Sequence, residues 1–250
     1  MSLALQIESV SKSFGGLMAV HDVTLEVEEG TVMGLIGPNG AGKTTLFNVI
    51  TGFHRPSSGR IAAHGEEISG LSPDAICRRG ICRTFQLLEV FPTMTVFDNV
   101  AVGVLASQRR TFQVLGTIGE TSRRRVNQIL EMTRLQDRAE VPVAQLGLPE
   151  RKKVELAVAL AANPRILLLD EPVAGMAVGE KPALIELIRT IQEQTGVTTV
   201  LIEHDVDVIW GIADQVAVLH YGQIIAQGTP QQIRADERVR DVYLGQERHA

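Results

Sequence analysis

The stretch GPNGAGKTTLFNVI, residues 37 to 50, contains residue types and a spacing that suit phosphate chemistry. Gly37, Gly42, Lys43 and Thr44 follow the pattern G-x-x-x-x-G-K-[ST], in which successive backbone N–H groups cradle phosphate oxygens. The lysine reaches the β- and γ-phosphates, and the following hydroxyl ligates Mg²⁺. Glycines recur because side chains would block the approach of the phosphates. We therefore expect a nucleoside triphosphate to bind Gly37, Pro38, Asn39, Gly40, Ala41, Gly42, Lys43, Thr44 and Thr45.

A second set of residues that could do chemistry is ILLLDEP, residues 166 to 172. A buried strand that ends in Asp170 places a carboxylate at the carboxyl edge of the sheet, where open α/β sheets bind ligands. We expect Asp170 to hold Mg²⁺, usually through water, and Glu171 to accept a proton from the attacking water or to orient it. The alternative is a core strand that ends in two solvated acids. Beside the glycine loop we favour the catalytic interpretation.

The elements that must position these residues follow from the hydrophobic pattern. TVMGLIG is a short apolar run that leads into the glycine loop, and KTTLFNVITG reads as a helix that ends at Gly52. Strand, loop and helix in this order favour a phosphate site over the alternative of an ordinary glycine-rich turn. ILLLD and TTVLIEH are continuous apolar runs, typical of parallel strands buried on both faces, and a helix that stops at Gly196 lies between them.

The rest of the pattern separates strands from helices. LALQIESV and VTLEVEEG read as strands, RPSSGRIAAHGEEI as a turn and a hairpin, and VAVLHYGQIIAQG as a hairpin that turns at Tyr221-Gly222. From about Thr93 to Asn163 the strand signals fade and apolar residues recur at helical spacing, with Pro149 at a helix entrance. We therefore expect an α/β core that a helical insertion interrupts.

Composition limits the class of protein. The chain has 250 residues, 44% of them hydrophobic, and its net charge of −5 argues against a broad polyanion-binding surface, so nucleic acid is not an expected partner. No apolar run approaches the ~18 residues of a membrane-spanning helix, and the N-terminus lacks the pattern of a secretory signal. Cys77 and Cys82, the only cysteines, are expected to be free, partly buried thiols. We expect a soluble chain in a reducing, cytoplasmic compartment.

Taken in order, these motifs resemble the ATP-binding subunit of an ABC (ATP-binding cassette) transporter over essentially the full length. The phosphate loop at 37–44 is followed by TFQ at 84–86, a helical insertion, LLLDEP at 167–172 and LIEHD at 201–205. The resemblance implies an α/β fold with a P-loop NTPase (RecA-like) core, an antiparallel β subdomain and an inserted α-helical subdomain. One ABC ATP-binding domain would span 1–250, with the core at 1–86 and 166–235, the helical insertion at about 87–165 and a short C-terminal extension at 236–250.

The resemblance also implies roles for residues that indicate little alone. Phe14, in SKSFGG, would stack on the adenine ring. Gln86 would sense Mg²⁺ and the γ-phosphate where the insertion joins the core, and His204 would contact the γ-phosphate. Outside this order of motifs, such a phenylalanine, glutamine or histidine is more often structural. The implied catalytic residues are Lys43, Gln86, Glu171 and His204, the implied metal ligands are Thr44, Gln86 and Asp170, and the implied cofactors are ATP and Mg²⁺.

Finer features resemble one branch of the family. GLMAVHDVTLEVEEG, CRTFQLLEVFPTMTVFDNV and the tail GTPQQIRADERVRDVYLGQE are similar to the branched-chain amino acid uptake group. The ATPases of that group also resemble those of urea import and lipopolysaccharide export, so the substrate stays open. The implied partners are membrane permease subunits, a second ATP-binding subunit and an extracytoplasmic solute-binding protein, at the cytoplasmic face of the inner membrane, where this chain would be peripheral.

The permease contact is expected near residues 86–100. Leu87, Leu88, Val90 and Phe91 are expected to be exposed there. Packing of these residues only within the helical insertion is the alternative.

The chain departs from the family pattern at two places. The signature Leu-Ser-Gly-Gly-Gln, which is offered to the ATP of the opposing subunit, falls at Leu146 to Glu150 as LGLPE. Gly147 lacks the hydroxyl, Pro149 lacks an N–H donor, and Glu150 adds a negative charge. Ala177 replaces the usual acidic or amide residue. We hypothesise that the partner is a non-identical ATPase subunit with a better signature; a tolerated variant in a homodimer is the alternative.

Two other classes of protein compete with a transport motor. A soluble ABC ATPase that acts on ribosomes or DNA generally carries two cassettes or a very long coiled-coil insertion, and this chain has neither. A regulator that binds ATP but barely hydrolyses it would fit the altered signature, but Glu171 argues against it.

Overall fold

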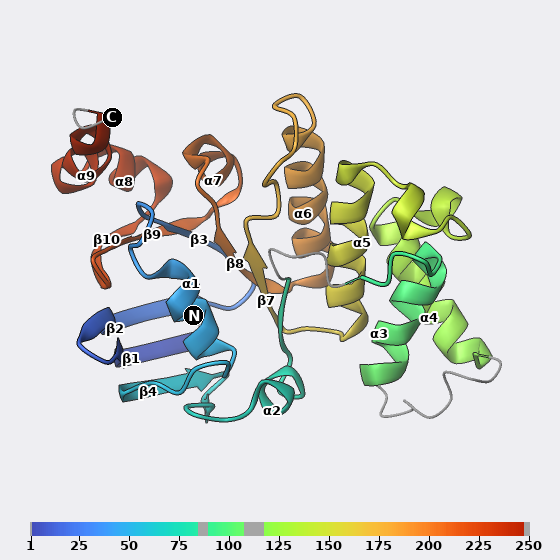
Figure 1. The fold of residues 1–250 in the computed structure, drawn as a ribbon, viewed down its shortest axis with the longest axis horizontal. Helices are drawn as coiled ribbons and strands as arrows, with labels where there is room; N and C mark the ends of the chain where they lie inside the picture. Colours follow the sequence, from blue (N-terminus) through green and yellow to red (C-terminus); the bar gives the residue numbers. More distant parts are fainter. Residues whose placement is uncertain (1, 85–89, 108–117, 248–250) are drawn as a thin grey trace.

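The structure, a computed structural model, describes residues 2–84, 90–107 and 118–247. In these ranges the chain forms two sheets with helices around them (Figure 1). One sheet has the strand order β10-β9-β3-β8-β7-β6 and the other has the order β2-β1-β4-β5. The first consists of β3 (Val32–Ile36), β6 (Ile81–Arg83), β7 (Ile166–Asp170), β8 (Thr198–Ile202), β9 (Gln215–His220) and β10 (Gln223–Gly228), and the second of β1 (Leu3–Phe14), β2 (Leu17–Glu28), β4 (Ser58–Ala63) and β5 (Glu66–Glu67).

The first sheet is parallel from β9 through β3, β8 and β7 to β6, while β10 runs antiparallel to β9. All residues of β3, β7 and β8 are buried. On β7, Leu167 and Leu169 belong to one hydrophobic cluster, whereas Ile166 and Leu168 belong to the other. The prediction that these apolar runs are strands buried on both faces is confirmed, and their carboxyl ends meet at one edge of the sheet.

The second sheet is antiparallel and covers helix α1 (Lys43–Ile50). Phe47 of α1 is fully buried in the same cluster as Leu5 of β1 and Leu35 of β3, so the helix joins the two sheets. The predicted start at Lys43 is confirmed. The helix ends at Ile50, two residues before the expected Gly52, because Thr51 already adopts a C-cap conformation.

The other helices lie around the sheets and at one end of the molecule. Helices α3, α4 and α5 pack against one another beside the β6–β7 end of the parallel sheet (Figure 1). They are the helices predicted between Thr93 and Asn163, and this prediction is confirmed over the described residues. The helices are α2 (Pro73–Cys77), α3 (Val96–Ser107), α4 (Glu120–Met132), α5 (Leu148–Ala161), α6 (Lys181–Thr195), α7 (Val206–Ile212), α8 (Pro230–Ala235) and α9 (Glu237–Glu247), with 3₁₀ turns η2 (Gln136–Arg138) and η3 (Val143–Gln145).

Two predicted chain reversals are confirmed. Gly196 ends α6 in a left-handed conformation with φ of 68°, as glycine C-caps do. Tyr221 and Gly222, with φ of 44° and 78°, form the tight turn between β9 and β10, where the right-handed twist of the strands favours positive φ at both positions.

The surface near residue 90 differs in part from the prediction. Val90 is half buried and packs against the larger hydrophobic cluster, so its predicted exposure is wrong. The cause is a clamp in which Asn99 accepts a hydrogen bond from the Phe91 N–H and donates one to the Phe91 carbonyl, at 2.7 and 3.1 Å. Phe91 itself is 54% exposed, as predicted. Leu87 and Leu88 lie outside the described residues.

Two further predictions concern the thiols and the membrane. Both cysteines are free; Cys82 is buried, whereas Cys77 is exposed. Within the described ranges, none of the helices combines the length and the apolar character that spanning a bilayer requires.

Candidate functional site

The phosphate loop joins the end of β3 to the start of α1, and two of its glycines are required by the protein itself. A Cβ on Gly37 would lie 2.1 Å from the Leu219 carbonyl oxygen, and one on Gly42 would lie 2.3 Å from the Ala19 carbonyl oxygen. The expected reason, open space for phosphate, fits only Gly40, whose added Cβ would meet nothing within 4 Å. Gly37 and Gly42 instead let the loop pass against β9 and β2.

Backbone hydrogen bonds hold the loop in place. The Gly222 N–H donates to the Ala41 carbonyl at 2.8 Å, and the His21 N–H donates to the Gly222 carbonyl at 2.8 Å. The β9–β10 turn is thus hydrogen-bonded to both the loop and β2. Gly42 caps α1 without a side-chain hydrogen bond. The first N–H groups of a helix have no partner within it, and the start of α1 is therefore suited to an anion.

Lys43 is folded against its own loop. Its Nζ donates to the carbonyl oxygens of Gly37 and Pro38 at 2.6 and 3.0 Å, and the residue is only 6% exposed. Burial lowers the pKa of the Lys43 ammonium, although the charges of Glu171 and Asp170 oppose this shift. The ammonium is thus held among carbonyl dipoles that phosphate oxygens could replace. Thr44, the next residue, is exposed at the helix start.

Asp170 lies at the end of β7 with a fully buried side chain. Its Oδ2 forms an ion pair with Arg83 Nη2 at 2.5 Å, and Arg83 Nη1 also donates to Asn48 Oδ1 of α1 at 2.6 Å. Asp170 Oδ1 is buried and has no hydrogen-bond partner among the described residues. A buried carboxylate oxygen without a partner is costly, so this atom is where a cation or its bound water would be stabilised.

The donors present fit Mg²⁺. In the described part of the chain, no group of three or more His, Cys, Asp or Glu could hold a metal by itself. Magnesium is usually held by one or two carboxylates together with substrate phosphates and water, so it does not need such a group. The Asp170 carboxylate and the Thr44 hydroxyl are oxygen donors of the kind it prefers.

Glu171 and His204 follow adjacent parallel strands and meet at the edge of the sheet. His204 Nε2 lies 2.7 Å from Glu171 Oε1. Glu171 has φ of 50°, a left-handed conformation that costs about 1–2 kcal/mol outside glycine. Its N–H donates to the Ile202 carbonyl at 2.9 Å, which fixes this conformation. Backbone strain of this kind is found mainly at functional sites, where it orients a side chain.

Glu203 supports this pair and was missed in the sequence. It is 3% exposed and accepts a hydrogen bond from the Val173 N–H at 2.9 Å, two residues after Glu171. The pKa of Glu203 is raised to about 7, mainly by burial and also by the charge of Glu171, while the hydrogen bond from the Val173 N–H opposes the shift. The sequence did contain a signal for Glu203, because a charged residue stands directly between the apolar run of β8 and His204.

A cavity of about 380 Å³ brings most of the predicted residues together. The loop from Asn39 to Thr45 lines it along with Glu171 and His204. Leu17, Met18 and Ala19 of β2 and the Tyr221-Gly222 turn also line it, and the sequence did not indicate them.

Phe14 is placed differently. Phe14 is 43% exposed and is not among the residues that line this cavity, but it pairs with Leu17, which is. Its ring packs edge-on against His54, with centroids 5.1 Å apart, and Lys12 Nζ lies 4.9 Å from the ring centroid. Gln86 lies outside the described residues.

The altered signature forms the start of α5. Gly147 is the exposed N-cap and provides no side-chain hydrogen bond. Leu148 lies against the segment after Glu171, where a Cβ on Gly175 would be 3.4 Å from Leu148 Cδ2. Glu150 Oε1 accepts from Arg138 Nε at 2.8 Å, so the negative charge expected there is partly neutralised.

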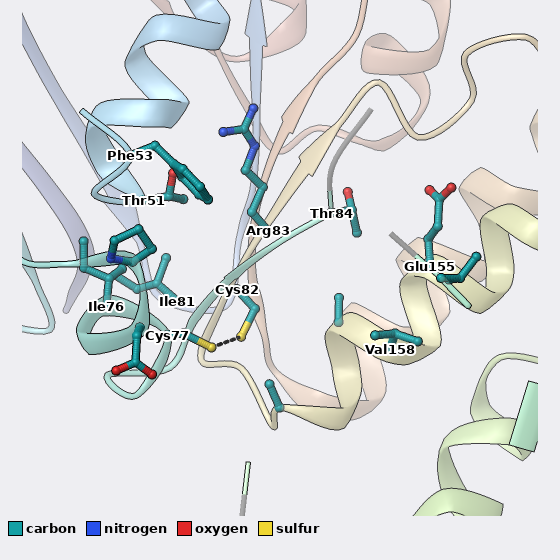
Figure 2. Close-up of a pocket in the computed structure, with 15 residues that line it drawn as sticks. Thr51, Phe53, Ile76, Cys77, Ile81, Cys82, Arg83, Thr84, Glu155 and Val158 are labelled. Carbon is teal, nitrogen blue, oxygen red and sulfur yellow. Dashed lines mark hydrogen bonds between the residues drawn. The ribbon is translucent and has the colours of Figure 1, made fainter. Parts of the chain in front are cut away.

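A second cavity of about 420 Å³, here called the subdomain pocket, lies between α2, β6 and α5 (Figure 2). Glu155 of α5 faces it and is paired with Lys152, the Oε2 and Nζ atoms lying 3.4 Å apart. Burial raises the pKa of Glu155, while Lys152 opposes the shift. The lining residues are Thr51, Phe53, Pro73, Asp74, Ile76, Cys77, Ile81, Cys82, Arg83, Thr84, Val90, Glu155, Val158, Ala159 and Ala162.

Comparison with known proteins gives consistent matches. A family model described as "ABC transporter" matches residues 20–174, and one described as "Branched-chain amino acid ATP-binding cassette transporter" matches residues 223–249. BraF of Pseudomonas aeruginosa, a "High-affinity branched-chain amino acid transport ATP-binding protein", is 38% identical over 97% of this chain and 98% of its own length. LivG of Escherichia coli, described in the same words, is 37% identical with the same coverage.

Solved structures agree with these relatives. MJ1267, described as an ATP-binding cassette of an ABC transporter in its ADP conformation, matches with a TM-score of 0.88 at 31% identity, covering 98% of this chain and all of that one. CbiO1 of Clostridium perfringens, part of the transporter complex cbiONQ, matches with a TM-score of 0.84 at 28% identity over 98% of this chain and 96% of its own. With its phosphate loop, its β7 carboxylates and its inserted helices, the chain belongs to the ABC transporter family as an ATP-binding cassette ATPase with a P-loop NTPase fold.

Proposed function

We propose that the chain is the ATP-hydrolysing motor subunit of an importer for branched-chain or related amino acids. The observation that carries the motor assignment is the joining of the phosphate loop with the Glu171–His204 pair around one cavity. The substrate class rests on the descriptions of BraF and LivG and on the match of residues 223–249.

The site residues have separate tasks in this proposal. The loop N–H groups bind the phosphates, and Lys43 moves from the loop carbonyls to the β- and γ-phosphates. Thr44 and Asp170 would hold Mg²⁺, with Gln86 as a further ligand, and Asp170 Oδ1 is the buried oxygen without a hydrogen-bond partner among the described residues. Bound Mg²⁺ supplies charge neutralisation on the phosphates.

Glu171 and His204 would act on the attacking water and the γ-phosphate. Glu171 orients the attacking water or accepts its proton, and His204 holds the Glu171 carboxylate and contacts the γ-phosphate. Phe14 stacks on the adenine. Its ring either moves away from His54 to do so or binds the adenine on its solvent-exposed face.

We propose permease subunits, a second ATP-binding subunit and an extracytoplasmic solute-binding protein as partners, with this chain peripheral at the cytoplasmic face of the inner membrane. ATP closes the two ATPase subunits and product release opens them. The subdomain pocket and the exposed Phe91 are the proposed contact with the permease, because residues of the core and of the inserted helix α5 line this pocket together. One ATP-binding domain over 1–250, with the core at 1–86 and 166–235, stays part of this proposal.

The second ATPase subunit is proposed to be non-identical. Losing hydrogen bonds to a charged phosphate costs about 1.5–3 kcal/mol each. The attraction between the phosphate and the dipole of α5, which begins after Gly147, compensates only about 0.3–1 kcal/mol at an exposed site. This chain would therefore give its partner a weak contact, whereas Lys43, Asp170 and Glu171 would serve the ATP bound to its own loop.

The test is ATP hydrolysis by the chain alone and with co-purified membrane subunits. We expect permease subunits to co-purify in mild detergent, hydrolysis to rise in the complex, and Lys43→Ala to abolish nucleotide retention and amino acid uptake. A soluble ABC ATPase would instead co-purify with ribosomal proteins, and a regulator would bind ATP without turnover. Uptake of urea, or export of lipopolysaccharide, by the complex would move the assignment to another branch.

A further inference from the structure

The two cysteines of the chain lie together in the wall of the subdomain pocket (Figure 2). Cys77 is the last residue of α2 and Cys82 lies in β6, with their Sγ atoms 3.7 Å apart. The turn between them is held by hydrogen bonds from Arg79 N–H to the Ile76 carbonyl and from Gly80 N–H to the Cys77 carbonyl, at 3.0 and 2.9 Å. The sulfurs therefore face each other on a fixed turn.

The two thiols are not equivalent. Cys77 is exposed, whereas Cys82 is 6% exposed and reaches solvent through the pocket. The pKa of Cys77 is lowered to about 7, mainly by the hydrogen bond from Cys82 and also by the neighbouring Arg78, while burial and the charge of Asp74 oppose the shift. The same hydrogen bond and burial raise the pKa of Cys82. Since the thiolate is the nucleophile, Cys77 is the attacking sulfur.

We propose that Cys77 and Cys82 form a reversible oxidation site, at which a hydroperoxide converts the two thiols into an intramolecular disulfide. The Cys77 thiolate attacks one peroxide oxygen, the O–O bond breaks, and the departing hydroxide takes a proton to become water. Cys77 is now a sulfenic acid, oxidised by two electrons, and the peroxide is reduced.

The second step closes the ring. Cys82 loses its proton to solvent and attacks the Cys77 sulfur, so that an S–S bond forms, the S–O bond breaks, and hydroxide leaves and is protonated. Two thiols and one hydrogen peroxide give one disulfide and two waters. The sulfurs need to approach by less than about 2 Å to reach the bond length of a disulfide. A thiol reductant reverses the reaction by exchange.

The disulfide would act on two features already described. It would link α2 covalently to β6, whose next residues, Arg83 and Thr84, contact Asp170. It would also replace two thiols in the pocket wall that is proposed to meet the permease. That effect on transport rests on the proposed function, whereas the oxidation itself does not.

The test uses the purified full chain, in which these are the only cysteines. After treatment with hydrogen peroxide we expect both thiols to disappear together, the intact mass to fall by two hydrogen atoms, and dithiothreitol to restore both. Alkylation of Cys77 by iodoacetamide is expected to inflect near pH 7 rather than near the ~8.5 of an ordinary thiol.

Two variants separate the roles. In Cys82→Ala, Cys77 is expected to form a sulfenic acid that dimedone traps and that gives no intramolecular disulfide. In Cys77→Ser, oxidation of Cys82 is expected to slow by about tenfold or more, because its thiolate is disfavoured. A gain of oxygen without loss of hydrogen in the wild type, or a disulfide only between two chains, overturns the proposal. These readouts need no ATP, so their failure leaves the motor assignment intact.

Discussion

Arg83 and Asp170 form an ion pair in the interior, with Nη2 and Oδ2 2.5 Å apart and side chains that are 6% and 0% exposed. The pair joins β6 to the neighbouring strand β7, which carries the proposed magnesium ligand. Because Arg83 also reaches Asn48 on α1, one guanidinium links the helix of the phosphate loop with the carboxylate. Among the residues that the structure describes, Asp170 Oδ1 has no hydrogen-bond partner, and it is the atom that we propose faces a metal.

Removing the Arg83 charge should therefore cost much of the stability of the fold. Breaking a buried pair from one side typically costs about 3–5 kcal/mol, so Arg83→Gln should lower the free energy of unfolding by that order. Arg83→Lys keeps the charge but loses the link to Asn48 and should cost less. The measurement is urea unfolding without nucleotide.

The matched control for Arg83 is Arg78→Gln. Arg78 pairs with Asp74 on the surface of α2, and exposed pairs contribute about 0.2–1 kcal/mol. If Arg83→Gln costs no more than this control, the buried pair contributes nothing specific.

The glycines of the phosphate loop should separate into two kinds. Gly37→Ala and Gly42→Ala bring a methyl group against a carbonyl oxygen and should lose stability by the ~1–3 kcal/mol of overpacking in addition to backbone strain. Gly40→Ala meets open space and should cost only the ~1–2 kcal/mol of a left-handed residue, but should weaken ATP binding by narrowing the cavity. Thermal unfolding and ATP titration measure the two effects. Wild-type ATP affinity in Gly40→Ala would contradict the role given to that residue.

Glu203 should make stability depend on pH. Its folded pKa of about 7 lies above the ordinary 4.5, so the folded state holds a proton that the unfolded state has lost between these values. Stability from this group is therefore greatest below pH 4.5 and falls until about pH 7, by a total of roughly 3 kcal/mol. Glu203→Gln keeps an acceptor for Val173 and should be more stable than the wild type at pH 8, but not at pH 4.5.

Urea unfolding at both pH values tests the Glu203 prediction, with the exposed Glu131→Gln as the control. The same pH dependence in Glu203→Gln as in the wild type would show that another group is responsible.

Glu171 and His204 should affect turnover more than binding. Glu171→Gln keeps the shape and the contact with His204 but cannot accept a proton, so ATP turnover should fall by about 10²–10⁴-fold while ATP affinity is retained. His204→Ala should also lower turnover, because the carboxylate loses the partner that orients it. Single-turnover hydrolysis and ATP titration distinguish these effects; a parallel loss of affinity in Glu171→Gln would argue for a structural role.

The sequence predicted the parts of the site that depend on local spacing. The loop from Gly37 to Thr45 and the carboxylates at the end of β7 could be located, because the loop joins a strand to a helix and the carboxylates end a buried strand. His204 was placed through the order of motifs, and the adjacency of β7 and β8 explains why it meets Glu171.

Contacts between distant segments could not be predicted in this way. Arg83 and Asp170 lie 87 residues apart in the chain, and nothing in TFQ or in LLLDEP indicates that they pair. The reasons for Gly37 and Gly42 were misjudged, because the obstacle is the backbone of β9 and β2 rather than a ligand. The burial of Val90 likewise depends on the clamp formed by Asn99.

The altered signature should make the two ATP sites of the assembled transporter unequal. Gly147 offers no hydroxyl, and Glu150 is paired with Arg138, so we expect the ATP of the proposed partner subunit to receive few hydrogen bonds from α5. In the purified complex, Glu171→Gln in this chain should therefore stop most turnover, while the corresponding change in the partner should reduce it much less. Gly147→Ser should restore part of the contact and raise turnover at the partner's site, with only a few tenths of a kcal/mol of added helix stability. Equal losses from the two glutamate changes, together with no gain from Gly147→Ser, would show that the two sites work alike and that a homodimer suffices.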